Sequence, residues 1–230
     1  MSEQLTSKDL INESLDEEME RKGTSPYPDW LNVKKQLTFY ASYHSNPVNI
    51  AIHMVCIPMI LWSFLLILAH VPLTSAAPKT IAPFLSFQNN AALWYNSAYV
   101  LYYFALEPFG ALTYLPQAIL SQLTVTHLAS FPSSTQSLPG PFKGVGSMKL
   151  ALLVQLFSWL SQFIGHGAAE GRAPALLDNL LQAVVLAPFF SHLEFLFLAF
   201  NYNPKLQAEI KQGVKEDKAR RMKEKAKKTR

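Results

Sequence analysis

The chain has 230 residues, enough for one domain, and 50% of them are hydrophobic. Its net charge of +4 is unevenly spread: residues 1–30 carry eight acidic and three basic side chains, and residues 205–230 carry eleven basic and four acidic ones. Only ten charged side chains lie between these ends, far below the roughly 25% of a soluble domain, so the middle of the chain is predicted to lie in a membrane.

The N-terminal part predicts an acidic arm, an interfacial helix and a first membrane span. Residues 1–29 are expected to form a mobile arm. Residues 30–43, WLNVKKQLTFYASY, mix aromatic and polar side chains, which is typical of a helix at headgroup level. Asn46-Pro47 then favours a helix start, because Asn is a good N-cap and Pro suits the first helical position. Residues 48–69 contain no Asp, Glu, Lys or Arg and are long enough to cross a bilayer.

Beyond residue 69 the sequence predicts four further apolar helices, at residues 91–106, 111–129, 148–165 and 176–200. The first two are short and could form one hairpin, with the second interrupted at Pro116. The last is expected to kink at Pro188. The connection at residues 70–90 is predicted to be irregular and partly re-entrant, and residues 130–147 are predicted to form a loop.

These segments predict an all-α fold, a multi-pass transmembrane helix bundle of about four spans. The chain divides into an acidic arm (1–29), a membrane-embedded domain (30–204) and a basic tail (205–230). The excess of Lys and Arg in the tail predicts a cytosolic C-terminus and a helix close to the membrane surface. An even number of crossings would place the N-terminus in the cytosol as well.

Several classes of protein are excluded by the motifs that the chain lacks. The single cysteine, Cys56, cannot form a disulfide framework within one chain or a Cys-rich zinc site, and its apolar surroundings favour a packing role. No Gly-rich phosphate loop, GxSxG sequence or nucleic-acid-binding module is present, so we expect no nucleic acid partner. The first 30 residues have no apolar signal-peptide region, so the internal apolar segments are expected to direct insertion.

Two histidines flank the predicted helix start at Asn46-Pro47. His44 precedes it, and His53 lies about two turns inside the helix. Because helical side chains lean toward the N-terminus, the two imidazoles could converge. Asn49, four residues before His53, could orient its ring. The alternative is that His44 is an interfacial residue and that His53 bonds to a neighbouring carbonyl group.

A second cluster lies in QFIGHGAAEGRAPAL, residues 162–176. His166 and Glu170 are four residues apart, on one face of a continuing helix, and Arg172 follows. This is a high density of ionisable groups for a chain with so few charges. The alternative is a membrane-edge cap in which Glu170 pairs with Arg172.

Three histidines and a carboxylate are enough to hold a metal ion. Such ligands suit Fe²⁺ with open coordination positions, and zinc is the competing ion. The chain lacks HExxH, and its six histidines cannot supply the eight-histidine set of membrane di-iron hydroxylases and desaturases. The weaker candidates for the site are His127, His192 and Glu194, and His70 is expected to be interfacial.

The chain resembles the small multi-pass 2-hydroxy fatty acid dioxygenases of the fungal endoplasmic reticulum in three stretches: FYASYHSNPVNIAIHMVCIP, FIGHGAAEGRAPALLDNL and VLAPFFSHLEFLF. The resemblance covers most of residues 30–205. It implies a Fe²⁺ enzyme that uses O₂ to shorten 2-hydroxy fatty acids by one carbon, in the α-oxidation branch of phytosphingosine breakdown. It also implies a metal site formed by His44, His53 and His166.

Two further residues carry over from the resemblance. Arg172 is expected to clamp the substrate carboxylate, and Glu170 is expected to act as a fourth ligand or as a base. The last four residues, KKTR, are similar to a dilysine retrieval signal, which agrees with the endoplasmic reticulum membrane. A non-enzymatic scaffold or lipid-organising protein of that membrane is the alternative function. A transporter is less favoured, because no matched pair of broken helices is visible.

Overall fold

A computed structural model describes residues 28–44, 46–170 and 182–228. The first 27 residues of the predicted acidic arm lie outside the described residues. In chain order, the elements are η1 (Asp29–Leu31), α2 (Val33–Tyr43), α3 (Pro47–Ala69), β1 (Lys79–Ala82), β2 (Leu85–Phe87), α4 (Ala91–Leu106), α5 (Pro108–Ser130), η2 (Pro132–Ser137), η3 (Gly140–Phe142), α6 (Ser147–Gly165), η4 (His166–Glu170), η6 (Gln182–Leu186), α7 (Ala187–Phe200) and α8 (Pro204–Lys228).

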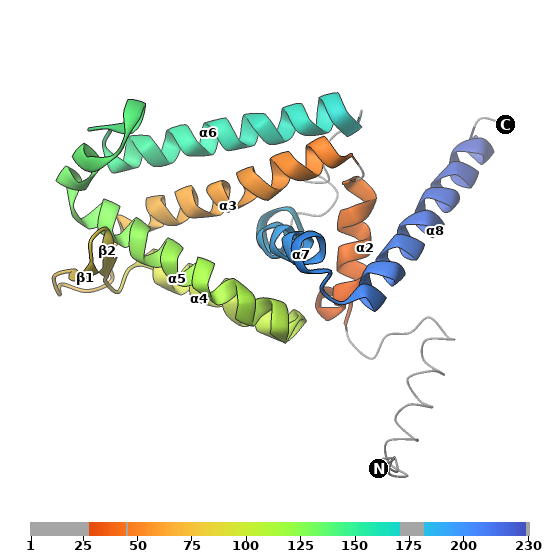
Figure 1. Ribbon diagram of the computed structural model, residues 1–230, viewed down its shortest axis with the longest axis horizontal. Coiled ribbons are helices and arrows are strands. Elements are labelled where there is room, and N and C mark those ends of the chain that lie inside the picture. Colours follow the sequence, from red (N-terminus) through yellow and green to blue (C-terminus); the bar gives the residue numbers. More distant parts are fainter. Residues whose placement is uncertain (1–27, 45, 171–181, 229–230) are drawn as a thin grey trace, which may run out of the picture.

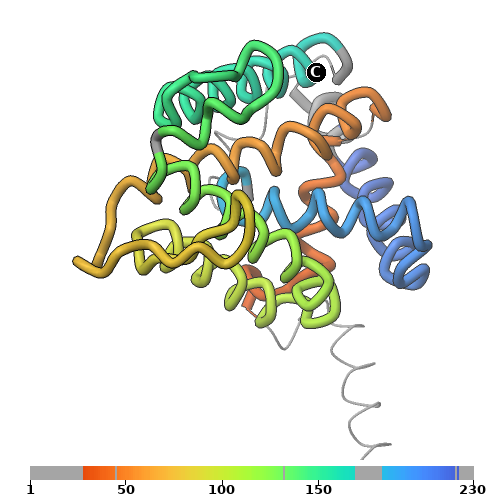
Figure 2. The backbone as a smooth tube through the Cα atoms, turned by 60° about the vertical axis from the view of Figure 1, so that its left-hand side comes forward, coloured from red at the N-terminus to blue at the C-terminus, as the bar shows by residue number. Residues whose placement is uncertain are grey.

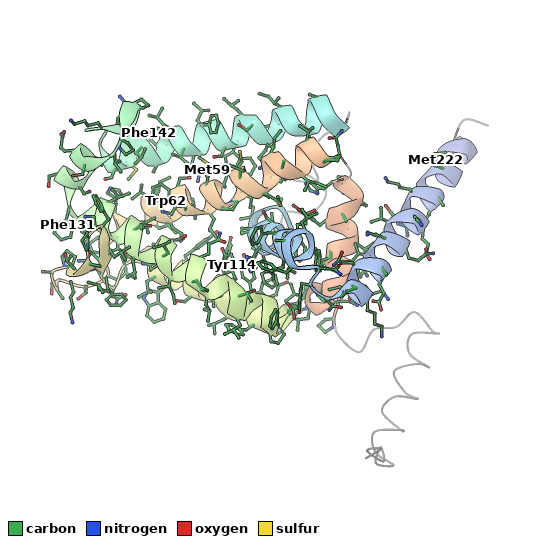
Figure 3. The ribbon with its side chains drawn as sticks, in the orientation of Figure 1. Met59, Trp62, Tyr114, Phe131, Phe142 and Met222 are labelled. Atoms are coloured by element: carbon green, nitrogen blue, oxygen red, sulfur yellow. The ribbon has the colours of Figure 1, made fainter. Side chains whose placement is uncertain are left out.

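The helices form a bundle in which α3 and α6 run side by side (Figure 1). Helices α4 and α5 form an antiparallel hairpin on one side of this pair, and α7 passes between that hairpin and α2 (Figures 1 and 2). The indole Nε1 of Trp62 on α3 donates to Oγ1 of Thr124 on α5, 2.9 Å away, and ties the pair to the hairpin (Figure 3).

Three helices in the described part of the chain are long and apolar enough to cross a membrane: Pro47–Ala69, Ser147–Ala168 and Ala183–Phe200. The outer face of α6 is apolar, as lipid contact requires; its exposed residues include Leu152, Leu156, Phe157, Leu160, Phe163 and Ile164. The prediction of a multi-pass helical membrane protein is therefore confirmed. Helices α4 and α5 form the hairpin that the sequence allowed and do not add to the three long spans.

Two local predictions differ from the structure. Pro116 does not interrupt α5, which runs unbroken from Pro108 to Ser130. A proline inside a helix removes one backbone hydrogen bond, and packing of α5 against its neighbours outweighs that loss.

The connection after α3 contains a small antiparallel hairpin, β1 and β2, with Lys79 opposite Phe87. Of the last predicted span, residues 176–181 lie outside the described part; the rest contains a π-helix, η6, followed by α7, which begins at Ala187 next to the predicted kink at Pro188.

Helix starts follow the predicted capping rules. The Asn46 side chain accepts the Val48 N–H at 2.9 Å, and Pro47 occupies the first position of α3. The Glu107 carboxylate likewise accepts the Gly110 N–H at 2.6 Å at the start of α5. These caps hold the short turns between α2 and α3 and between α4 and α5.

The C-terminal helix α8 packs along α2 (Figure 1). Leu206 and Ile210 are buried, and Lys34 on α2 pairs with Glu209 on α8 at 3.3 Å. Farther along, Met222 points away from the bundle and is 73% exposed (Figure 3). The first half of α8 is therefore part of the packed structure, and it supports the helix that leads to His44.

Helix α6 lies close against α3 at Gly165. A β-carbon at this position would lie 2.6 Å from Oδ1 of the fully buried Asn49 and 3.2 Å from Cδ1 of Ile52. At Gly167, two residues farther on, a β-carbon would meet nothing within 4 Å. An alanine at Gly165 would therefore disturb helix packing, whereas an alanine at Gly167 would show only the general effect of replacing a glycine.

We predict that Gly165→Ala destabilises the protein by roughly 1–3 kcal/mol, because overpacking would force α6 away from α3. Thermal unfolding in detergent, followed by circular dichroism, measures this effect, with Gly167→Ala as the matched control. Equal melting temperatures for the two variants would contradict the close packing at Gly165.

Candidate metal centre

Three histidines from three different elements meet at one end of the α3–α6 pair. His44 caps the C-terminus of α2, His53 lies on α3, and His166 is the first residue of η4 after α6. One nitrogen of each ring lies within 4.8 Å of one nitrogen of each of the others. The side chains are 8%, 4% and 3% exposed. This buried group can hold a metal ion. His53 and His166 are 113 residues apart in the chain, and the packing of α6 on α3 brings them together.

Local structure brings the first two rings together. Helix α2 ends at Tyr43, His44 leaves the helical conformation with φ −124° and ψ 86°, and α3 begins at Pro47. The short turn therefore folds His44 back over the first turns of α3, where His53 lies. The ring centroids of the two histidines are 4.4 Å apart, as the predicted convergence requires.

Helix α6 supplies the third ring. His166 lies 5.1 Å from His44 and 4.8 Å from His53, measured between ring centroids. The chain widens to a π-helix over His166–Glu170, a feature that often occurs at functional sites.

Backbone carbonyl groups orient two of the rings. Nδ1 of His44 lies 2.7 Å from the Tyr40 oxygen, and Nδ1 of His53 lies 2.9 Å from the Asn49 oxygen. A carbonyl oxygen only accepts, so each Nδ1 must carry the proton, and each Nε2 then presents a lone pair. Neutral imidazoles held in this way are typical of metal ligands. Asn49 thus orients His53 as predicted, but through its main chain.

Tyr40 and Glu194 lie beside the histidines. The Tyr40 ring stacks on His44 with centroids 4.1 Å apart, and its hydroxyl donates to Oε2 of Glu194 at 3.3 Å. Burial, and then the nearby Glu194 carboxylate, raise the pKa of Tyr40 well above its ordinary value, so the phenol remains a donor. Sequence reasoning ranked Glu194 low and missed Tyr40, although its position four residues before His44 on a helix was the available signal.

An apolar cavity of about 200 Å³ opens from the three histidines and runs along α3 and α6. Its walls are mainly aliphatic and aromatic, with Tyr40 and the histidines at one end; they include Ile57, Leu61, Phe64, Trp159, Phe163 and Val184. Such a cavity suits a long apolar ligand whose polar end lies at the metal group.

The remaining candidates lie elsewhere or outside the described part. Glu170 ends η4, and the position of its side chain is not described; Arg172 lies outside the described residues. His127 contacts Ser86 at 3.0 Å, and His192 contacts Thr113 at 2.9 Å, so neither joins the three histidines. His70 caps α3 and contacts Ser147 at 3.0 Å.

We predict that His44→Ala, His53→Ala and His166→Ala each lower metal affinity at least about tenfold, since even the loss of an outer partner has effects of that size. Metal content after dialysis against Fe²⁺ or Zn²⁺ measures the loss. Bound metal should also stabilise the wild type by about 2.7 kcal/mol at roughly 100 times Kd. His127→Ala is the control, and equal metal loss in this variant would contradict the assignment.

Comparison with known proteins identifies a family for this chain. The sequence pattern of the family described as 2-hydroxy-palmitic acid dioxygenase Mpo1-like matches residues 30–198, which include all three histidines. The chain is 31% identical over 184 residues to 2-hydroxy-palmitic acid dioxygenase MPO1 of Saccharomyces cerevisiae, covering 80% of this chain and 90% of that protein. No solved structure matches. The chain therefore belongs to the Mpo1-like family of 2-hydroxy fatty acid dioxygenases.

Proposed function

We propose that this protein is a Fe²⁺-dependent membrane dioxygenase that converts 2-hydroxy fatty acids to fatty acids one carbon shorter. The observation that carries the proposal is the buried three-histidine group at the end of a long apolar cavity. The group matches the polar end of such an acid, and the cavity matches its acyl chain. Family membership supports the same substrate class.

The donor set fits ferrous iron. Three neutral imidazoles are borderline ligands that suit both Fe²⁺ and Zn²⁺, and they leave coordination positions for substrate and O₂. Zinc has no redox chemistry, whereas the proposed reaction is an oxidation by O₂, which favours iron. When bound, Fe²⁺ would supply the redox chemistry that joins O₂ to the substrate.

The proposed reaction needs no outside reductant. A 2-hydroxy acid, R–CH(OH)–COOH, and O₂ give R–COOH, CO₂ and H₂O, and the bond between C1 and C2 breaks. The carbon at C2 loses three electrons and C1 loses one, which supplies all four electrons that O₂ accepts. The reaction therefore does not call for a second organic substrate.

The chain's own residues would bind and orient the substrate. His44, His53 and His166 would hold the ion, and the apolar walls would bind the acyl chain and exclude water. Tyr40, which lines the cavity beside His44, would present a phenol to the polar end of the substrate. Arg172 remains our candidate for the clamp on the substrate carboxylate, because its planar fork suits that anion, and Glu170 remains our candidate for a further ligand or base.

The membrane would supply the fatty acid substrate and determine how the fatty acid is oriented in the cavity. We propose that α8 lies in the cytosol, because its basic side chains follow the positive-inside rule. The metal group lies at the end of α3 that adjoins α2, on which α8 packs. The polar end of the fatty acid would then lie near the cytosolic surface with its tail along α3 toward the bilayer centre. We also propose that the protein lies in the endoplasmic reticulum membrane, where phytosphingosine breakdown would supply the substrate.

We predict that purified protein loaded with Fe²⁺ converts 2-hydroxypalmitic acid to pentadecanoic acid, with O₂ consumed and CO₂ released in equal amounts. Protein loaded with Zn²⁺ should be inactive, because zinc cannot exchange electrons. His53→Ala should lose at least about 99% of the rate, an effect of roughly 2.7 kcal/mol, while the control His127→Ala stays active. Absence of product from the iron-loaded wild type, or equal activity with zinc, would refute the proposal and favour a scaffold role.

A further inference from the structure

The apolar cavity has two long walls of matching length. On α3, its lining residues run from His53 to Phe64, and on α6 they run from His166 back to Gln155. Each stretch advances eleven positions along a helix, which corresponds to about 16 Å at 1.5 Å per residue. A single acyl chain that starts at the histidines would therefore lie lengthwise between the two helices.

The end of the cavity far from the histidines is formed by aromatic rings. Phe64 on α3 contacts the Tyr95 ring on α4 edge to face, with centroids 5.2 Å apart. The Tyr95 hydroxyl bonds to that of Tyr99, and the Tyr99 hydroxyl donates to the Val184 carbonyl at 3.2 Å. Since Tyr99 uses its own proton on Val184, Tyr95 must donate to Tyr99. This chain of contacts ties α3, α4 and η6 together across the cavity.

We propose that Phe64 and Tyr95 form an end wall that sets the length of acyl chain the protein accepts. The inference rests on the proposed function, because it assumes that the hydroxy acid end binds at the histidines. A tail that reaches the wall ends against these two rings. A longer tail would have to displace those rings and separate the Tyr95 and Tyr99 hydroxyls.

Physical costs make this wall selective. Moving Tyr95 would leave a hydroxyl without its partner in apolar surroundings, and the loss of that hydrogen bond opposes the movement. Phe64 also packs against Tyr95, so displacing either ring would lose that contact. A shorter tail meets no such barrier, but it leaves part of the wall without contacts and binds less tightly. The wall should therefore produce an optimum of chain length instead of a simple upper limit.

The test compares kcat/KM for 2-hydroxymyristic, 2-hydroxypalmitic, 2-hydroxystearic and 2-hydroxyarachidic acids. Phe64→Ala and Tyr95→Ala should raise the preference for longer over shorter acids about tenfold, the size of effect that a pocket exerts per misfit methylene. Phe64→Trp should shift the optimum to shorter acids. Val55→Ala, which removes a 61% exposed side chain on the same helix, should leave the preference unchanged.

A binding assay separates this proposal from the proposed function. Trp159 lines the cavity, so quenching of its fluorescence reports acid binding in metal-free protein, with Trp159→Phe as the blank. If the wild type makes no product but Phe64→Ala still shifts binding toward longer acids, the end wall stands and the dioxygenase proposal fails. If Phe64→Ala and Tyr95→Ala match Val55→Ala in both assays, or speed all four acids equally as a widened entrance would, the end wall is refuted.

Discussion

Burial of three imidazoles in an apolar helix bundle is the constraint on which the rest of this structure depends. Ionisable side chains are costly inside a membrane unless they are neutral and have partners. Here each ring is nearly inaccessible to solvent, and two of them direct Nδ1 at backbone carbonyl groups within their own helices. Each Nδ1 proton is thereby used on a carbonyl oxygen, which leaves Nε2 as the atom that can bind a metal ion. A metal ion bound by the three histidines would also link α2, α3 and the end of α6 to one another.

The elements around the histidines serve this arrangement. The chain changes direction at the capped helix start Asn46-Pro47, between His44 and His53, and the close approach at Gly165 brings in the third element. Helix α8 packs against α2, so the basic tail is physically connected to the helix that ends at His44. The apolar cavity then continues from the histidines along α3 and α6. A lipid substrate could thus approach from the bilayer, while the proposed chemistry stays at one end of the bundle.

Local sequence signals predicted much of this structure. The charge-poor middle predicted the membrane helices, and the capping residues predicted where α3 begins. The spacing of His44 and His53 predicted their convergence because a single short turn separates them. The position of His166 beside them depended on packing between distant segments, which periodicity alone cannot give and which only the resemblance to a family indicated. Tyr40 was missed for a related reason: its partner Glu194 is 154 residues away. The predicted interruption at Pro116 was wrong, because tertiary packing keeps α5 continuous.

X-ray absorption spectroscopy at the iron edge of Fe²⁺-loaded protein tests the central claim most directly. The account predicts the multiple-scattering pattern of three imidazole ligands in the wild type, and a pattern with one imidazole fewer in a folded His166→Ala sample. A spectrum with only oxygen ligands, or one that His166→Ala leaves unchanged, would contradict the assignment of the three histidines as the metal site.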